Sequence, residues 1–120
     1  MTPDFTPAPV KPPISKVQFD ALDIRVGKIV AVADVAGSDK LVALTVDFGD
    51  HQRTIIAGIK QERDAAALVG RQSLFVVNME PRKMRGAVSE GMLFDIGYAD
   101  GILPVLAIPE REVPNGARAG

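Results

Sequence analysis

Apolar residues alternate with polar ones through the first half of the chain, at the two-residue spacing typical of β-strands. The first such run covers residues 24–35, and its alternation changes phase across Gly27 and Lys28. This change predicts a β-bulge at Gly27, where the strand bends. Two further strands are expected at 41–48 and 53–59, because apolar residues recur there and a Gly-Asp turn separates the two runs.

The second half of the chain changes character once and then returns to strands. Residues 61–68 are rich in helix formers and end before Gly70, which predicts one short helix. Strands are expected at 73–78, at 92–96 and, across a nearly unbroken apolar run, at 102–108. A long bent strand, two more strands, a short helix and further strands follow the order of a small closed barrel. We therefore expect an all-β protein: a five-stranded OB-fold (oligonucleotide/oligosaccharide-binding) barrel with a short helix after strand three and a C-terminal strand extension.

Two segments lie outside the expected barrel. Residues 1–14 contain five prolines and little apolar bulk, so we expect a flexible tail ahead of a single domain over 15–120. The extension at 102–108 is apolar at almost every position and is interrupted by Pro104. A strand that is apolar on both faces needs cover that the barrel does not supply, and a second copy of the chain is the simplest cover. The sequence therefore predicts a homodimer formed through this extension.

Composition and charge narrow the class of protein. The 120 residues fit one domain, and the absence of cysteine excludes disulfides and thiolate metal sites. No apolar run approaches the roughly 20 residues that cross a bilayer, and the start does not resemble a signal peptide, so we expect a cytoplasmic protein without membrane contact. The net charge of −1 argues against a general polycation, but residues 51–90 hold seven basic and four acidic residues. Positive charge is thus concentrated in one third of the chain, as a local binding site requires.

Catalytic chemistry has little support in the sequence. His51 is the only histidine of the chain, and a metal site formed with Asp47 and Asp50 is less plausible than an ordinary solvated turn. Ser89 lacks the Gly-x-Ser-x-Gly setting of a hydrolase nucleophile, and the segment before Lys60 lacks the glycine-rich run of a phosphate-binding loop. We therefore expect a binding module and not an enzyme, with no cofactor and no metal.

The segment 78–92 carries the strongest candidate for a binding site. Three basic residues, Arg82, Lys83 and Arg85, fall within four positions, in a loop between the fourth and fifth expected strands. In an OB-fold barrel this loop overhangs the ligand face, so the three cations can reach the phosphates of a nucleic acid. Nearby methionine and polar side chains can contact sugars and bases: Asn78, Met84, Ser89 and Met92. The alternative is a solvated basic turn, in which one methionine anchors the loop and the other belongs to the core.

Other basic residues can extend this face. Lys40 lies in the turn 37–41, which an OB-fold barrel places at the same end as the basic loop, and Arg53 and Lys60 lie on the third expected strand. Aromatic residues are few: the chain has five phenylalanines, one tyrosine and no tryptophan. This scarcity argues against binding by stacking of single-stranded bases on a row of aromatic rings. Recognition of the shape and backbone of a folded RNA fits this composition better. The phenylalanines on expected strands are assigned to the core: Phe48, Phe75 and Phe94.

Four stretches resemble the motifs of the tRNA-binding domain family, which includes the C-terminal domain of bacterial methionyl-tRNA synthetase, free-standing dimeric tRNA-binding proteins and the CsaA chaperones. Residues 19–29 (FDALDIRVGKI) are similar to the opening motif of the family, and 37–41 (GSDKL) to one of its turns. Residues 78–92, with NMEPRKMRG followed by SEGM, resemble its central signature. Residues 113–120 (VPNGARAG) resemble its C-terminal end, so that the likeness covers about 16–120.

The resemblance implies an OB-fold barrel with a C-terminal extension, dimerisation through that extension, and tRNA bound by shape without an active site. It also implies a free-standing protein, because no catalytic domain accompanies the motifs. Two alternatives stay open: a CsaA-like export chaperone that binds unfolded polypeptides, and an accessory subunit that docks on an aminoacyl-tRNA synthetase. The residues that the resemblance places at or near the tRNA-binding face are Lys40, Asn78, Arg82, Lys83, Met84, Arg85, Ser89 and Met92.

Overall fold

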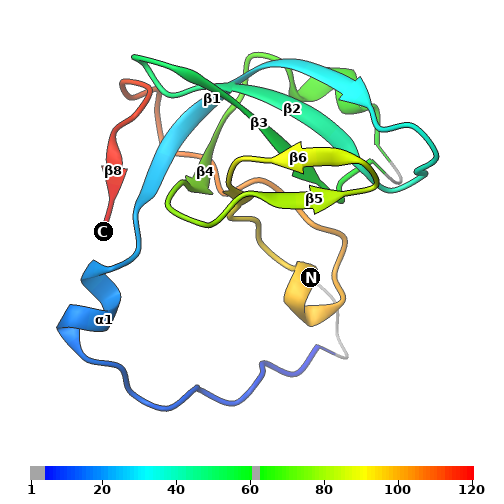
Figure 1. Cartoon of the computed structure of the whole chain (residues 1–120). Coiled ribbons are helices and arrows are strands. Elements are labelled where there is room, and N and C mark those ends of the chain that lie inside the picture. The colour runs from blue at the N-terminus through cyan, green and yellow to red at the C-terminus, as the bar shows by residue number, and fades with distance from the viewer. Residues whose placement is uncertain (1–4, 61–62) are drawn as a thin grey trace.

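A curved antiparallel sheet forms the body of the molecule (Figure 1). The computed structural model describes residues 5–60 and 63–120. Five strands are joined in the order β3-β2-β1-β4-β7, and a sixth short strand, β8, pairs with the start of β1. The expected all-β, OB-like barrel is confirmed. The strands of this sheet are β1 (Ile24–Asp34), β2 (Val42–Asp47), β3 (Gln52–Ala57), β4 (Gln72–Val76), β7 (Met92–Leu93) and β8 (Arg118–Ala119).

The long strand β1 serves two parts of the sheet, as a small barrel requires. Its first five residues, 24–28, pair with β4, and its later residues, from 28 to 34, pair with β2. On the edge opposite β4, before the pairing with β2 begins, the backbone N–H of Val26 donates to the carbonyl of Ala117, and the N–H of Gly116 donates to the carbonyl of Val26. The C-terminal end of the chain is therefore attached to the barrel through β1.

Hydrogen bonds of Ser89 and Glu90 close the barrel between β3 and the segment that leads into β7. The hydroxyl of Ser89 accepts from the backbone N–H of Ile56 at 2.9 Å. The backbone N–H of Glu90 donates to the carbonyl of Thr54 at 2.8 Å, and the carboxylate of Glu90 accepts from the N–H of Thr54 at 2.9 Å. These bonds satisfy backbone groups of β3 that would otherwise lie at an open sheet edge. The barrel is thus nearly closed, although β7 is only two residues long.

The bulge predicted at Gly27 lies further along the strand. Gly27 pairs regularly with Ser73 of β4, whereas the β1–β2 register shifts between Ile29 and Ala31. Position 27 requires a glycine for packing, because a Cβ placed there would lie 2.4 Å from Cγ1 of Val46. The prediction was wrong because the glycine and the phase change lie close together in sequence but have separate causes.

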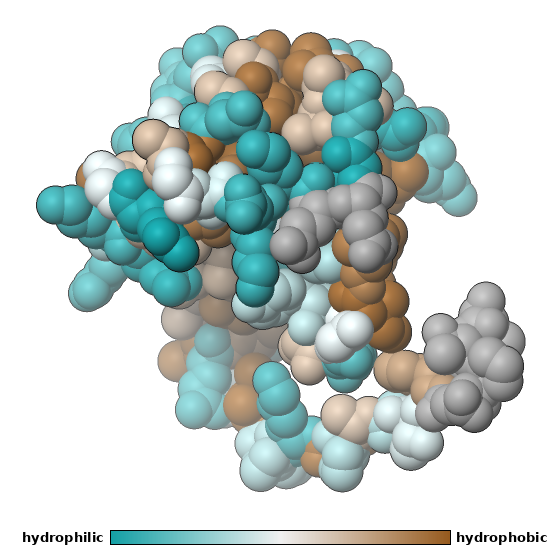
Figure 2. Space-filling view, turned by 90° about the vertical axis from the view of Figure 1, so that its right-hand side faces the viewer, coloured by the Kyte–Doolittle hydropathy of each residue, from teal (hydrophilic) through white to brown (hydrophobic). Residues whose placement is uncertain are grey.

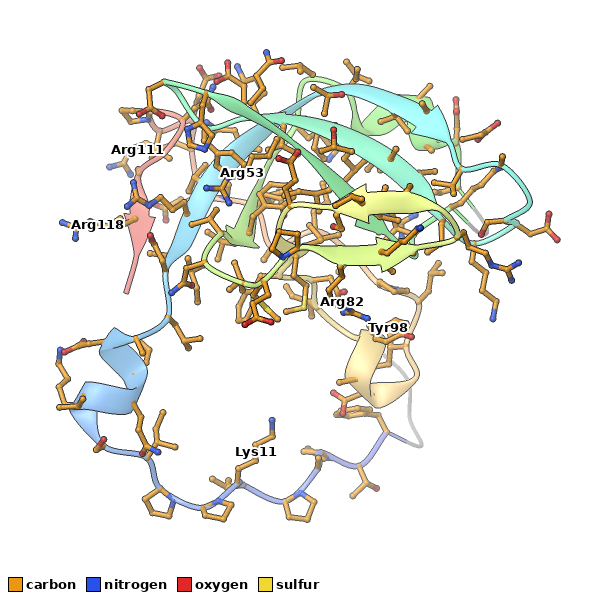
Figure 3. All side chains as sticks on the ribbon, viewed as in Figure 1. Lys11, Arg53, Arg82, Tyr98, Arg111 and Arg118 are labelled. Carbon is orange, nitrogen blue, oxygen red and sulfur yellow. The ribbon has the colours of Figure 1, made fainter. Side chains whose placement is uncertain are left out.

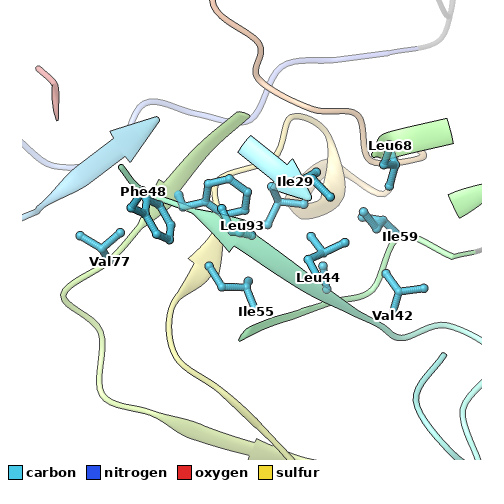
Figure 4. Close-up of a cluster of buried hydrophobic side chains, with 12 residues drawn as sticks. Ile29, Val42, Leu44, Phe48, Ile55, Ile59, Leu68, Val77 and Leu93 are labelled. Carbon is cyan, nitrogen blue, oxygen red and sulfur yellow. The ribbon is translucent and has the colours of Figure 1, made fainter. Parts of the chain in front are cut away.

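The core fills the interior of the barrel and includes residues from all its main strands (Figure 4). Phe48 and Phe75 pack edge to face, with ring centroids 5.6 Å apart, which confirms both as core residues. Burial of each large apolar side chain contributes roughly 1.5–3 kcal/mol, so this cluster is the main source of stability. Its members are Ile29, Val42, Leu44, Val46, Phe48, Ile55, Ala57, Ile59, Leu68, Phe75, Val77 and Leu93.

Two short helical elements flank the first three strands, one before β1 and one after β3. Helix α1 (Lys16–Asp20) precedes β1 and begins with a capping box, in which Ser15 and Gln18 satisfy each other's backbone N–H groups. The helix predicted over 61–68 is a single 3₁₀ turn, η1 (Ala65–Leu68), that begins at Asp64; residues 61 and 62 lie outside the described part. Only Leu68 of this turn is buried, so the local preference of its alanines does not extend the helix.

The C-terminal extension at 102–108 is not a strand, contrary to expectation. A second 3₁₀ turn, η2 (Tyr98–Asp100), precedes it, and a single bridge joins Val105 to Ile96. Pro104 is buried in the middle of the segment and supplies no backbone donor, which interrupts any ladder at that point. Several apolar side chains of this region are nevertheless exposed: Ile96, Ile102, Leu103, Val105 and Ile108.

A separate two-stranded hairpin stands over one side of the barrel. It consists of β5 (Arg82–Met84) and β6 (Ala87–Ser89), where the sequence predicts an irregular loop. The tail at 5–14 is extended and exposed, and Figure 2 shows that much of it is separated from the barrel, although Phe5, Thr6 and Ala8 line a pocket together with residues 100–103. Among the described residues, no helix has the length and apolar character that a membrane crossing needs.

Candidate nucleic-acid interface

The basic residues of the central motif are displayed on the β5–β6 hairpin. Arg82 pairs with Ser89, Lys83 with Val88, and Met84 with Ala87. The turn uses Arg85 and Gly86, whose φ angles of 51° and 83° are both left-handed, as a tight two-residue hairpin turn requires. The side chains of the basic trio are exposed on this hairpin: Arg82, Lys83 and Arg85.

A groove of about 420 Å³ lies between this hairpin, the end of β3 and the turn η2. Four residues of the expected site line it together, namely Arg82, Met84, Ser89 and Met92. The groove is mainly apolar, with Arg82 in its lining and the other exposed cations of the hairpin, Lys83 and Arg85, close by in the sequence. Its lining is completed by Leu41, Ile56, Ala57, Gly58, Ile59, Gly91, Leu93, Phe94, Asp95, Tyr98 and Ala99.

The turn 37–41 reaches the same groove, as expected from the OB-fold arrangement. Leu41 lines the groove, and Lys40 beside it is exposed. The carbonyl of Lys40 accepts from the backbone N–H of Lys60, which places these two residues side by side. The ammonium of Lys60 also lies 3.0 Å from the carboxylate of Asp34, so its charge is partly compensated. Lys40 is therefore the more available cation at this end.

Two polar residues of the expected site have internal hydrogen bonds. Ser89 is only 2% exposed, and its hydroxyl both accepts from Ile56 and donates to the carbonyl of Gly91 at 2.8 Å. Asn78 accepts from the backbone N–H of Asp23 at 2.9 Å and donates to the carbonyl of Ala21 at 2.6 Å. These bonds join segments far apart in the sequence, which gives both side chains a structural task.

Arg53 lies away from the groove and supports the closure of the barrel (Figure 3). Its guanidinium donates to the carbonyls of Val77 and Glu90 at 2.6 and 3.1 Å, and its Nε donates to Nε2 of His51 at 3.0 Å. The same group lies 6.0 Å from the centre of the Phe48 ring. Arg53 thus connects β3 to the segments that follow β4 and β6.

Two aromatic residues of the groove were missed by the sequence analysis. Phe94 was assigned to the core, but it is 43% exposed because its neighbour Leu93 is the side chain that points inward. Tyr98, for which the sequence pattern predicts no role, is 69% exposed on η2. The alternation from Met92 to Phe94, read with Leu93 as the buried position, is the signal that could have found the first of them. Nothing in the local pattern identifies Tyr98.

The region around His51 contains no candidate metal centre. Nδ1 of His51 lies 2.6 Å from the carboxylate of Asp50, and this hydrogen bond holds the pKa of Asp50 below its ordinary value. Asp47 accepts from the backbone N–H of Gly49 instead. Across residues 5–60 and 63–120, no three His, Cys, Asp or Glu side chains are grouped so that they could hold a metal ion.

Comparison with known proteins identifies relatives of this arrangement. Residues 24–118 match the family model described as "Putative tRNA binding domain". The chain is 40% identical over 111 residues to the methionine–tRNA ligase of Nitrosomonas europaea, which covers 92% of this chain and 16% of the ligase. The ligase of Pyrococcus abyssi is 43% identical over 100 residues, which cover 83% of this chain and 14% of that enzyme. The chain therefore spans about a sixth of the length of these ligases.

Solved structures show the same architecture. A MetRS related protein from Pyrococcus horikoshii superposes with a TM-score of 0.84 and 34% identity, covering 92% of this chain and 100% of that one. The chaperone CsaA from Bacillus anthracis superposes with a TM-score of 0.80 and 26% identity, covering 91% and 100%. The family match extends over nearly all of the described barrel, from the start of β1 into β8. The chain belongs to the tRNA-binding domain family.

Proposed function

We propose that this protein binds folded tRNA without catalysing a reaction, and that the β5–β6 hairpin and the adjacent groove form the contact surface. The observation that carries the proposal is the placement of Arg82, Lys83 and Arg85 together on one exposed hairpin beside the groove. Arginine and lysine on a rigid hairpin can reach several phosphates at once, and phosphate contacts dominate the affinity of proteins for nucleic acids. Lys40, at the other end of the groove, extends the positive surface.

The structure of the turn supports a binding task for Arg85. A residue other than glycine at a φ of 51° has a less favourable backbone, at a cost of about 1 kcal/mol. Asparagine or glycine would fill the position with less strain. An arginine there adds nothing to the hairpin ladder but adds an exposed guanidinium at its tip. We therefore assign Arg85 to phosphate contact.

The functional unit that we propose is a homodimer. Exposed apolar side chains at Ile102, Leu103, Val105 and Ile108 support it, although the segment is not the strand that the sequence predicts. A second copy would bring a second basic hairpin, and two linked sites raise the affinity for a large folded RNA without new kinds of contact. Because tRNA occurs in the cytoplasm, this proposal agrees with the expected cytoplasmic location of the protein.

The direct test is the binding of unfractionated folded tRNA by a variant with Arg82→Ala, Lys83→Ala and Arg85→Ala. We expect the affinity to fall by about tenfold or more, and the slope of log affinity against log salt to become shallower by about 0.7–0.9 for each lost phosphate contact. An unstructured RNA of the same length, titrated beside the tRNA, measures the preference for a folded ligand.

A matched control removes three positive charges elsewhere: Lys11→Ala, Lys16→Ala and Arg111→Ala. These residues are exposed and lie on the tail, on α1 and near the C-terminus, and none of them lines the groove. Figure 3 shows Lys11 and Arg111 away from Arg82 and Tyr98. Both variants have the same net charge, so a difference between them reports position and not total charge. Equal affinity of the two variants for tRNA would reject the hairpin as the binding site.

The apolar lining of the groove favours a second candidate function, the binding of unfolded polypeptide. The similarity to the structure of the CsaA chaperone supports this alternative. It predicts suppression of the aggregation of a denatured protein, with little dependence on salt, and no loss of this activity in the triple arginine and lysine variant. An aminoacyl-tRNA synthetase, on which this protein would dock as an accessory subunit, is a further candidate partner, and co-purification with such an enzyme is the test.

A further inference from the structure

We infer that the groove receives one unstacked nucleobase of the bound RNA, while the hairpin beside it holds the neighbouring phosphates. This inference rests on the proposed function and specifies what enters the groove. It differs from recognition through the backbone and shape alone, because a base leaves its stack and is held by side chains. Three features of the groove support a base as its occupant: the aromatic wall, a carboxylate in the lining, and the position of the basic residues.

Flexible and aromatic apolar groups form the walls of the groove. Met84 and Met92 contribute from the hairpin and β7, and Phe94 and Tyr98 contribute from the segment leading to η2 and from η2 itself. Phe94 and Tyr98 are both exposed, so these rings are not needed to fill the core. Every nucleobase has an apolar π-face that stacks on such rings, whereas a sugar-phosphate chain offers no comparable surface. The walls therefore match a base better than a backbone.

The charged residues of the groove favour the base and the phosphate of a nucleotide at different places. Asp95 lies in the lining of the groove, and its Oδ1 accepts from the backbone N–H of Tyr98 at 3.2 Å. A carboxylate repels phosphate, but its remaining acceptor positions suit the exocyclic amino group of adenine, cytosine or guanine. Arg82, which is exposed, lines the groove near Tyr98 (Figure 3). Phosphate is thus favoured beside Arg82, and a base is favoured beside Asp95 and the two rings.

The basic rim also favours RNA over polypeptide as the occupant. An apolar groove that takes unfolded chains has no need of three cations beside it, and these cations match a polyanion. Lys83 and Arg85 extend the positive charge along the hairpin from Arg82. A single protruding base, as in a loop or at a corner of a folded RNA, can enter the groove while its flanking phosphates stay at the hairpin.

The test compares tRNA binding by the whole protein and by a double variant, Phe94→Ala with Tyr98→Ala, at several salt concentrations. We expect the affinity to fall by about tenfold or more, because base–aromatic stacking is lost, and the salt slope to stay unchanged, because the phosphate contacts remain. Val17→Ala with Val69→Ala is the matched control, since both side chains are exposed and apolar but lie neither on the hairpin nor in the groove lining. Circular dichroism and thermal unfolding verify that each variant is folded.

A second measurement locates the base directly. Ultraviolet cross-linking of wild-type protein to tRNA, followed by mass spectrometry of peptides, should give nucleotide adducts at Phe94 or Tyr98. Unchanged tRNA affinity of the double variant, together with adducts elsewhere, would overturn the base pocket and leave tRNA binding intact. Absence of tRNA binding by the wild-type protein at low salt would instead overturn the proposed function, and with it this inference. Loss of polypeptide binding alone in the double variant, with tRNA affinity unchanged, would also count against a base as the occupant.

Discussion

Replacement of Gly27 by alanine is expected to destabilise the barrel. Gly27 faces inward on β1, and a Cβ at this position would lie 2.4 Å from Cγ1 of Val46 and 2.8 Å from Cε1 of Phe48. Its φ is outside the left-handed region, so the conflict is steric and does not come from the backbone conformation. Contacts this short require the two side chains or the strand itself to move.

The surroundings leave little room for that movement. Val46 is completely buried, and it pairs with Ile29 on the neighbouring strand. The ring of Phe48 is packed edge to face against Phe75 and is stacked on His51, with centroid distances of 5.6 Å in both cases. Overpacking of a tight core costs about 1–3 kcal/mol, and we expect about 2 kcal/mol here after the smaller gain from a stiffer unfolded chain.

Urea unfolding followed by circular dichroism measures this difference. With an m value of about 1–3 kcal/mol per molar urea, a loss of about 2 kcal/mol lowers the midpoint by roughly 1 M. Gly58→Ala is the matched control, because the nearest atom to its new Cβ is Cδ2 of Leu41 at 3.9 Å and its φ is also outside the left-handed region. This control should leave the free energy of unfolding unchanged or raise it by about 0.4–1 kcal/mol.

The outcome shows whether steric conflict is the reason for a glycine at position 27. If Gly27→Ala is as stable as Gly58→Ala, the steric argument is wrong. A double variant with Val46→Ala should lose less stability than the sum of the two single variants, because the methyl group added at Gly27 fills part of the space that Val46 leaves. Such non-additivity is expected only for residues in direct contact.

Three further substitutions test the hydrogen bonds and ion pairs around the site. Ser89→Ala should lower the free energy of unfolding by about 1–3 kcal/mol in a urea titration, because the backbone N–H of Ile56 is then buried without a partner. Asn78→Ala should lower it by about 1–2 kcal/mol and speed the hydrogen exchange of the backbone N–H of Asp23; an unchanged exchange rate would contradict the role assigned to Asn78. The hydrogen bond from Arg25 holds the pKa of Asp23 below its ordinary value of 3.8, so this group stabilises the fold above that value and the contribution is lost as the pH falls through the lowered pKa. Asp23→Asn should therefore make stability less dependent on pH below about 5, and an identical pH profile in the variant would contradict the prediction.

The sequence predicted the charged part of the candidate site better than its apolar part. Arg82, Lys83 and Arg85 are close together in the chain, so any turn between two strands displays them near one another. Phe94 was placed in the core because a phenylalanine on a strand is usually buried. Its exposure is decided by the pairing of Phe75 with Leu93, which sets the side that each residue of β7 faces. Such a pairing joins distant segments, and the local alternation by itself does not say whether Leu93 or its neighbours face inward.

For two polar residues of the central motif, too, the local sequence could not predict the role of the side chain. Asn78 and Ser89 stand in a motif rich in binding residues, and their side chains could serve either RNA or the fold. Their hydrogen-bond partners, Asp23 and Ile56, lie 55 and 33 residues away in the sequence. Only the closed barrel brings these groups within bonding distance, so only the structure could assign the two side chains an internal role.

Alternation of apolar residues determined the strands β1 to β4, their order and the turn positions, because a strand with one buried face must repeat every two residues. The cluster of basic residues located the exposed charged segment, since its charges cannot be buried, but predicted a loop where the structure forms the β5–β6 hairpin. Tertiary structure decided the rest: the position of the bulge, the irregular path of the extension around Pro104, and the closure by Ser89, Glu90 and Arg53. These features depend on contacts between segments that are distant in the chain, and the free energy of such contacts is not contained in any local pattern.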